Sequence, residues 1–228
     1  MKLVIANKNY SSWSLRPWLL LKHAGIPFEE EKLSFNDPEF KARVRRYSPV
    51  GKVPVLVDGD VVVWDSLAIA EYVAEKHPEA HLWPEDAAAR ARARSICAEM
   101  HSGFAAMRNH MTMNCELSLP GAVFQRDVQA DVARVLGIWR GCREAHQAKG
   151  PFLFGRFSVA DAFFAPVTRR FITYGTPLPP VAKQYVETMS ALPAMREWLA
   201  EALAEHDFVL EDEPYRTSRG QGPANSIA

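Results

Sequence analysis

The sequence predicts two domains: a mixed α/β domain over residues 1–77 and, after a linker at 78–86, an all-helical domain over 87–213. In the first part, short runs of β-branched residues alternate with helical patterns. From residue 84 on, apolar residues recur every three or four positions, as they do on one face of a helix. The last residues, 214–228, are rich in Ser, Gly, Arg and Pro, which indicates a disordered tail.

The order of elements expected in the first domain is β-α-β, an irregular segment, then β-β-α. The hairpin signal is Asp58-Gly59-Asp60 between two valine-rich runs. Pro17 in the first turn and Gly25 just past the end are typical of a helix between them. The expected elements are strands at 2–6, 29–33, 55–57 and 61–64, and helices at 14–24 and from 66 to about 76. This order predicts a small mixed sheet with helices on its faces.

The second domain is expected to contain long amphipathic helices. The apolar stripes run over 89–111 and 124–142, and further helices open at 158 and 193. At the third of these, Ser158 is followed three residues later by Asp161 and then by an apolar run. That spacing is typical of a capping box, in which side chain and backbone groups satisfy each other at a helix start.

Composition excludes several classes of function. Lys plus Arg and Asp plus Glu both number 27, so a nucleic-acid partner, which requires a basic surface, is not expected. No apolar run approaches the roughly 18 residues of a membrane span, and residues 1–5 lack the pattern of a signal peptide, so we expect a cytoplasmic protein. Cys97, Cys115 and Cys142 are widely spaced and the histidines are scattered, so we expect reduced thiols and no metal site.

The loop from Tyr10 to Arg16, between the first strand and the first helix, contains three serines. A hydroxyl at this position lies at a helix N-terminus, where backbone N–H groups and the helix dipole favour an anion. The alternative is that Ser12 or Ser14 only caps the helix.

Two further segments point to a peptide ligand. If the Val53-Pro54 bond is cis, Val53 presents its N–H and C=O groups to another extended peptide; the alternative is an ordinary trans bond at a strand start. Asp65-Ser66 opens a helix, where Ser66 and free N–H groups suit a carboxylate and Asp65 suits an ammonium group. Together the three segments describe a site for a short peptide with a free amino-acid end.

In this combination and order the sequence resembles the soluble (cytosolic) glutathione transferases over nearly its whole length. GKVPVL at 51–56 and DSLAIAEY at 65–72 look like the glutathione-site segments of that family's thioredoxin-like domain. FSVAD at 157–161 looks like its buried capping motif in the helical domain. SSWSLR at 11–16 resembles the SSCSWR segment of the serine-type zeta class, with Trp13 where that class has cysteine.

The resemblance implies that glutathione is the co-substrate and that Ser11 activates its thiol, with Ser12 as the next choice and Tyr10 as a rival. Lowering a thiol pKa of roughly 8.5 by ~2 units takes about 2.7 kcal/mol. One charge-assisted hydrogen bond contributes about 1.5–3 kcal/mol, and a helix N-terminus adds roughly 0.3–1 kcal/mol. A neutral serine that donates its proton therefore suffices, with no metal.

The resemblance also implies which residues bind the rest of the tripeptide. Val53 is expected to pair with the cysteinyl backbone across a cis-Pro54, and Lys52 to reach the glycyl carboxylate. Asp65 with Ser66 is expected to hold the γ-glutamyl end.

The electrophile's pocket is expected between the first loop and the stripe of the helical domain. The candidate residues are Met100, Phe104, Met107, Arg108 and Met111. The alternative for each is a place in the core or in a subunit interface. Arg108 is a cation beside apolar residues, which suits a substrate carboxylate; the alternative is a solvated helix charge.

The sequence thus predicts a homodimeric glutathione transferase that conjugates glutathione to a small electrophile in detoxification, or uses it for isomerisation. The alternative is a non-catalytic protein of the same fold that serves as an interaction platform. The presence of Ser11, Val53-Pro54 and Asp65-Ser66 favours the enzyme.

Overall fold

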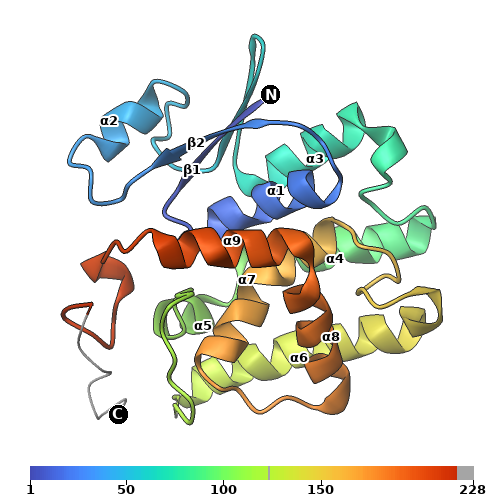
Figure 1. Ribbon diagram of the computed structural model, residues 1–228. Helices are drawn as coiled ribbons and strands as arrows, with labels where there is room; N and C mark the ends of the chain where they lie inside the picture. Colours follow the sequence, from blue (N-terminus) through green and yellow to red (C-terminus); the bar gives the residue numbers. More distant parts are fainter. Residues whose placement is uncertain (123, 220–228) are drawn as a thin grey trace.

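The computed structural model describes residues 1–122 and 124–219, and its first domain is built on a four-stranded sheet (Figure 1). The strands are β1 (Lys2–Ala6), β2 (Glu29–Leu33), β3 (Val55–Asp58) and β4 (Val61–Trp64), in the spatial order β2-β1-β3-β4. Strand β1 is parallel to β2 and antiparallel to β3, and β3 and β4 form an antiparallel hairpin. The predicted α/β class of this domain is therefore confirmed.

Helices cover both faces of the sheet. They are α1 (Ser12–His23), α2 (Phe40–Arg45) and α3 (Ser66–Lys76). Because side chains alternate along a strand, Leu3 and Ile5 of β1 join the core cluster that contains α1 and α3, whereas Val4 faces the other way. On that second face Val4 packs in a small cluster with Val44 of α2. Helices α1 and α3 thus lie between the sheet and the helical domain (Figure 1).

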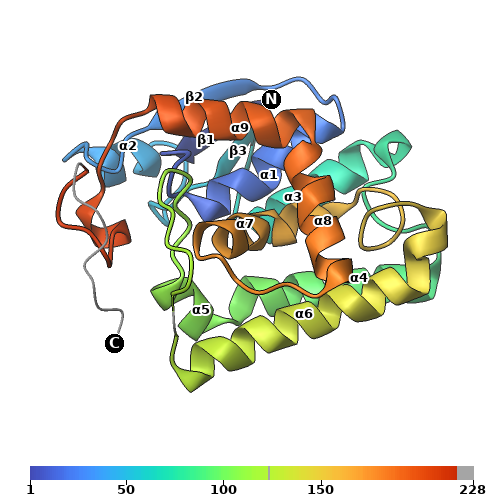
Figure 2. The same ribbon diagram turned by 60° about the horizontal axis from the view of Figure 1, so that its bottom comes forward.

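The second domain is all helical, as predicted. Its elements are α4 (Ala87–Ser102), α5 (Ala105–His110), α6 (Arg126–His146), α7 (Val159–Thr173), α8 (Pro180–Ala191) and α9 (Pro193–Ala204), with short 3-10 turns at Pro78–Ala80, Gln147–Lys149 and Leu210–Asp212. Helix α7 is buried along almost its entire length and packs against α1, α4 and α8 (Figure 2). None of the helices in the described residues is long and apolar enough to cross a bilayer.

The predicted capping box opens α7. Both reciprocal hydrogen bonds between Ser158 and Asp161 are present. Asp161 is fully buried, and its Oδ1 also accepts from the Leu153 N–H at 3.0 Å and from the Tyr185 hydroxyl at 3.1 Å. This carboxylate therefore ties the start of α7 to the preceding turn and to α8.

The structure differs from the expectation of a single helix over 89–111. Helix α4 ends at Ser102, Gly103 is extended, and Phe104 has the left-handed backbone conformation, with φ of 61°. A Cβ atom at Gly103 would lie 2.9 Å from the Glu99 carbonyl oxygen, so the break requires glycine. Helices α2 and α8 were not predicted either.

The chain after α9 returns to the first domain. Glu205 accepts hydrogen bonds from the backbone N–H groups of Lys8, at 2.7 Å, and Asn9, at 3.2 Å. Trp198 of α9 donates to the Lys8 carbonyl oxygen at 2.9 Å. Of the expected disordered tail, 220–228 lies outside the described residues; within its described part, Arg216 forms an ion pair with the buried Glu213.

Candidate functional site

A cavity of about 470 Å³ lies where the N-termini of α1 and α3 and the start of β3 meet helix α4. We call it the interdomain cavity. Its lining residues are Trp13, Val50, Lys52, Val53, Pro54, Trp64, Asp65, Ser66 and His101. The structure thus brings together all five residues expected to bind the backbone and the ends of a tripeptide.

Val53 and Pro54 form one edge of the interdomain cavity, directly before β3. The Val53-Pro54 peptide bond is cis, as the resemblance implies. Lys52, on the same edge, is exposed. A peptide placed along this edge would meet backbone groups of Val53 and a cation at one end.

Asp65 also lines the cavity and has an unusual backbone conformation. Its φ is 76°, a region that non-glycine residues rarely adopt and that recurs at functional sites. One carboxylate oxygen, Oδ1, caps α3 by accepting from the N–H groups of Leu67, at 2.8 Å, and Ala68, at 3.4 Å. The other oxygen, Oδ2, lies 3.1 Å from Nε2 of His101 on α4.

His101 leaves the charge of this carboxylate intact at neutral pH. Burial lowers the pKa of His101 below its ordinary value, although the carboxylate of Asp65 acts in the opposite direction. The imidazole is therefore neutral near pH 7 and does not neutralise Asp65. A ligand ammonium group is the natural partner for this oxygen.

The hydroxyl groups at the start of α1 have different partners. Ser11 caps the helix: its Oγ accepts from the Ser14 N–H at 3.3 Å and donates to Ser14 Oγ at 2.8 Å. Ser12 Oγ accepts from Nη2 of Arg170 at 3.3 Å, and its own proton has no acceptor within the described part of the chain. Both serines are buried, and neither lines the interdomain cavity; Trp13 is the residue of this loop that does.

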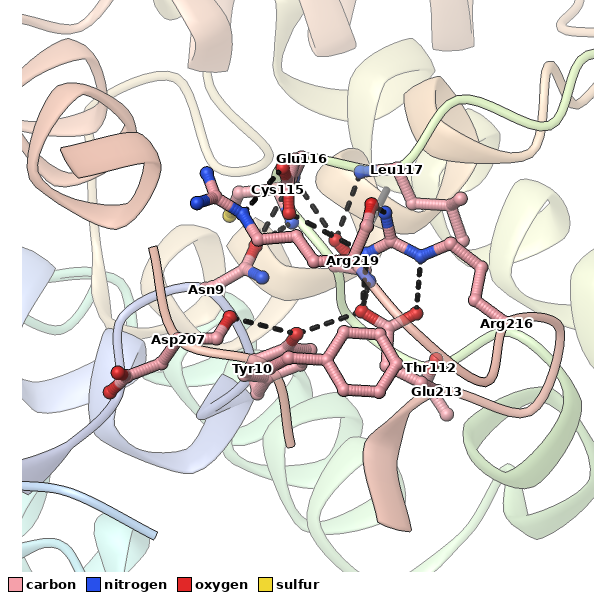
Figure 3. A network of polar contacts seen from close by, with 12 residues as sticks. Asn9, Tyr10, Thr112, Cys115, Glu116, Leu117, Asp207, Glu213, Arg216 and Arg219 are labelled. Atoms are coloured by element: carbon pink, nitrogen blue, oxygen red, sulfur yellow. Dashed lines mark hydrogen bonds and ion pairs between the residues drawn. The ribbon is translucent and has the colours of Figure 1, made fainter. Parts of the chain in front are cut away.

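Tyr10, the rival hydroxyl, is directed to the C-terminal segment (Figure 3). It donates to Oε1 of Glu213 at 2.8 Å, and Glu213 also accepts from Asn114 and Arg216. Burial and the neighbouring Glu213 raise the pKa of Tyr10 well above its ordinary value. Its proton is therefore held by a buried carboxylate, and Tyr10 does not line the interdomain cavity.

The electrophile candidates of the helical domain do not line this cavity either. Met100, Phe104 and Met107 are buried in the main core, and Met111 lines a separate apolar cavity of about 430 Å³ beside α6. The Arg108 guanidinium donates to carbonyl oxygens at the end of α4, with 3.0 Å to that of Gly103. The guanidinium therefore pairs with carbonyl oxygens that have no intrahelical partner at the C-terminal end of α4.

Four lining residues were missed by reasoning from the sequence: His101, Val50, Trp64 and, except as a departure from a motif, Trp13. The signal for His101 was weak, since it stands directly beside Met100 of the apolar stripe. The rings of Trp13 and His101 are in edge-to-face contact, with centroids 5.2 Å apart, so the two form one wall of the cavity.

Comparison with known proteins identifies the family. The sequence profile "Glutathione S-transferase, N-terminal domain" matches residues 10–76, and "Glutathione S-transferase, C-terminal domain" matches 85–201. The chain belongs to the glutathione S-transferase family. The predictions of this family and of its thioredoxin-like plus helical fold are thereby confirmed.

Individual relatives agree with this assignment. "Glutathione S-transferase Z1" of Arabidopsis thaliana is 30% identical over 209 residues, which are 85% of this chain and 91% of that protein. "Probable maleylacetoacetate isomerase" of Caenorhabditis elegans is 36% identical over 98 residues, 43% of this chain and 45% of that protein. A glutathione transferase homolog from Burkholderia GL BGR1, solved with bound glutathione, superposes with a TM-score of 0.67 at 23% identity, over 90% of this chain and 98% of that one.

Proposed function

We propose that this chain is a glutathione-dependent transferase whose interdomain cavity binds glutathione and presents its thiolate to a small electrophile. One observation carries the proposal: a single cavity is lined by Lys52, the cis Val53-Pro54 pair and Asp65-Ser66. These groups match the three parts of such a ligand: a terminal carboxylate, a peptide backbone and an amino-acid head group. Glutathione is the co-substrate of the family to which the chain belongs.

The thiol would be ionised by a serine hydroxyl at the start of α1. Ser12 is favoured over Ser11 because the Ser12 hydroxyl proton has no acceptor in the described part of the chain, whereas Ser11 donates to Ser14. Ser12 also accepts from the Arg170 guanidinium, and a hydroxyl that accepts from a cation is a stronger donor itself. The contact between Tyr10 and Glu213 argues against Tyr10 in this role.

The class of reaction is conjugation, with isomerisation as the second candidate. Isomerisation is favoured by the relative named probable maleylacetoacetate isomerase. Conjugation is favoured by the relative named glutathione S-transferase Z1, which the chain matches over a larger share of its length. Trp13 fills the position where the zeta-class motif has cysteine, so the wall of the cavity differs from that class.

The homodimer remains part of the proposal. Val61, Val62 and Trp64 of edge strand β4 are all exposed, with Trp64 43% accessible. An apolar edge strand of this kind needs a covering surface, and a second copy of the chain provides one.

The binding proposal is tested by calorimetric titration of glutathione into the protein and two matched variants. Asparagine also caps helices well, so Asp65→Asn keeps the start of α3 but removes the negative charge. We expect its dissociation constant to rise at least about tenfold, as for the loss of one charged contact. Asp86→Asn changes the same kind of cap on α4, away from the interdomain cavity, and should leave the affinity unchanged.

Turnover then separates the enzyme from the alternative. An aromatic halide reports conjugation, an organic hydroperoxide reports reduction, and a cis-dienoic acid reports isomerisation. Binding without turnover of any of them would support the non-catalytic interaction protein instead. Absence of glutathione binding to the unmodified chain would refute the proposal.

A further inference from the structure

Three arginines meet in the interior between the two domains: Arg16 of α1, Arg108 of α5 and Arg170 of α7. Arg16 is 1% exposed and Arg170 is 4% exposed. In the described part of the chain none of the three forms an ion pair with a carboxylate. Burial, and after it the charges of Arg108 and Arg170, lower the pKa of Arg16, yet a guanidinium keeps its proton at neutral pH.

Arg16 is held in a fixed position directly behind the interdomain cavity. Its guanidinium carbon lies 4.2 Å from the centroid of the Trp13 ring and 4.7 Å from that of the Phe163 ring. Its Nη1 donates to Ser66 Oγ at 3.4 Å, and Ser66 lines the cavity. Its Nε is buried without a hydrogen-bond partner among the described residues. A buried, incompletely satisfied cation is costly, so an anion bound close to it would offset part of that cost through charge attraction.

The charged residues that line the interdomain cavity indicate which carboxylate of the ligand this anion is. An α-amino-acid head group carries one ammonium and one carboxylate group. Asp65 provides the partner for the ammonium, and Lys52 is the proposed partner of the glycyl carboxylate. Among the described lining residues Lys52 is the one lysine or arginine, and the glycyl carboxylate takes it, so the α-carboxylate has the Ser66 hydroxyl and helix N–H groups but no lining cation of its own.

We propose that Arg16 is the positioning residue for the α-carboxylate of glutathione, and that it acts through the hydroxyl of Ser66. The Arg16 N–H occupies a lone pair of Ser66 Oγ, which leaves the serine proton to donate to the carboxylate. The guanidinium supplies the compensating positive charge one layer behind the ligand. This role rests on the proposed binding of glutathione and adds a residue to it.

The test compares two ligands that differ only in this carboxylate: glutathione, and an analogue with a γ-aminobutyryl group in place of the γ-glutamyl group. The affinity ratio of the two ligands is the preference for the carboxylate. The unmodified protein should prefer glutathione by roughly tenfold to a hundredfold, as expected for a charge at this depth. Arg16→Met should abolish most of that preference and leave the affinity for the analogue unchanged.

Further variants separate positioning from a merely structural role. Arg16→Gln keeps an N–H donor without the charge and should lose the preference as well, whereas Arg16→Lys keeps the charge and should retain most of it. In a Ser66→Ala background, Arg16→Gln should have little further effect, because the path through the hydroxyl is already broken. Arg143→Met, which removes a buried arginine that donates to the Gly150 and Phe152 carbonyl oxygens, is the control and should leave the preference intact.

Each outcome decides between the two proposals. If the unmodified protein does not bind glutathione, the proposed function fails. If it binds, but the Arg16 variants weaken both ligands by the same factor, the role of Arg16 is refuted and glutathione binding stands. Melting temperatures identify any variant that does not fold; should Arg16→Met be one, the ratio measured with Arg16→Gln decides.

Discussion

Replacement of Ser12 by alanine should raise the pKa of the thiol of bound glutathione. The proton of Ser12 has no acceptor in the described part of the chain, and its oxygen accepts from Arg170 at 3.3 Å. A hydrogen bond from such a hydroxyl to a thiolate contributes about 1.5–3 kcal/mol. At about 1.4 kcal/mol per pKa unit, its loss should raise the thiol pKa by about 1–2 units.

Ser11→Ala is the matched variant, because it removes the neighbouring hydroxyl with the opposite expected result. Ser11 accepts from the Ser14 N–H and donates to Ser14 Oγ, so its role lies in the start of α1. The variant should lose about 0.5–2 kcal/mol of folding stability, as for other N-caps, and leave the thiol pKa unchanged.

The assay is the ultraviolet absorbance of the thiolate in the protein–glutathione complex, titrated against pH, with stability taken from urea denaturation. The contrast between the two variants is the decisive quantity. A raised thiol pKa in Ser11→Ala with none in Ser12→Ala would exchange the two assignments. No change in either variant would refute activation by a serine.

The remaining predictions concern Tyr10, the buried Asp161 and His101. Tyr10→Phe leaves the buried Glu213 with one donor fewer and should cost about 1 kcal/mol of stability with no change in the thiol pKa; a raised thiol pKa would restore Tyr10 as the activating group. Asp161→Asn replaces Oδ2 by an NH2 group that cannot accept from the Ser158 N–H, and a buried unpaired donor costs about 1–3 kcal/mol. Urea denaturation should show that loss, and a loss below about 1 kcal/mol would contradict the structural role of Asp161. Burial lowers the pKa of His101 below its ordinary value of about 6.5, and the protonated ring pairs with Asp65. Glutathione affinity should therefore fall as the pH drops below that ordinary value, and His101→Gln should remove this dependence. Because the pKa of His101 is lower in the folded state than in the unfolded state, its contribution to stability is complete above the unfolded value and is lost as the pH falls.

Local patterns predicted the elements of the fold well. The strands at Lys2–Ala6 and Glu29–Leu33 have the predicted bounds, and the Ser158–Asp161 capping box is present. Each of these depends on side chains within a few residues of one another. The break between α4 and α5 was missed because the apolar spacing continues across Gly103, whose extended conformation carries no periodic signal.

The candidate site was predictable only in part. The segments around Val53 and Asp65 could be recognised because each is a short motif with its own backbone chemistry. Which hydroxyl keeps a free proton depends on partners that the motif does not show: Ser11 donates to Ser14. Ser12 accepts from Arg170, which lies far away in the sequence and reaches Ser12 only after the domains pack. The spacing of the apolar stripe likewise cannot show that Arg108 turns back to the end of α4.

The contact of Glu205 with the turn after β1 restricts which segments can be exchanged between this chain and its relatives in a chimera. The backbone amides of Lys8 and Asn9 find their acceptor nearly 200 residues later in the sequence, and the indole of Trp198 binds the Lys8 carbonyl oxygen. A chimera that exchanges only residues 1–77 would lose these hydrogen bonds unless the new partner supplies them. The buried backbone groups after β1 would then have no partner. The unit to transplant is the N-terminal portion together with α9 and the residues that follow it.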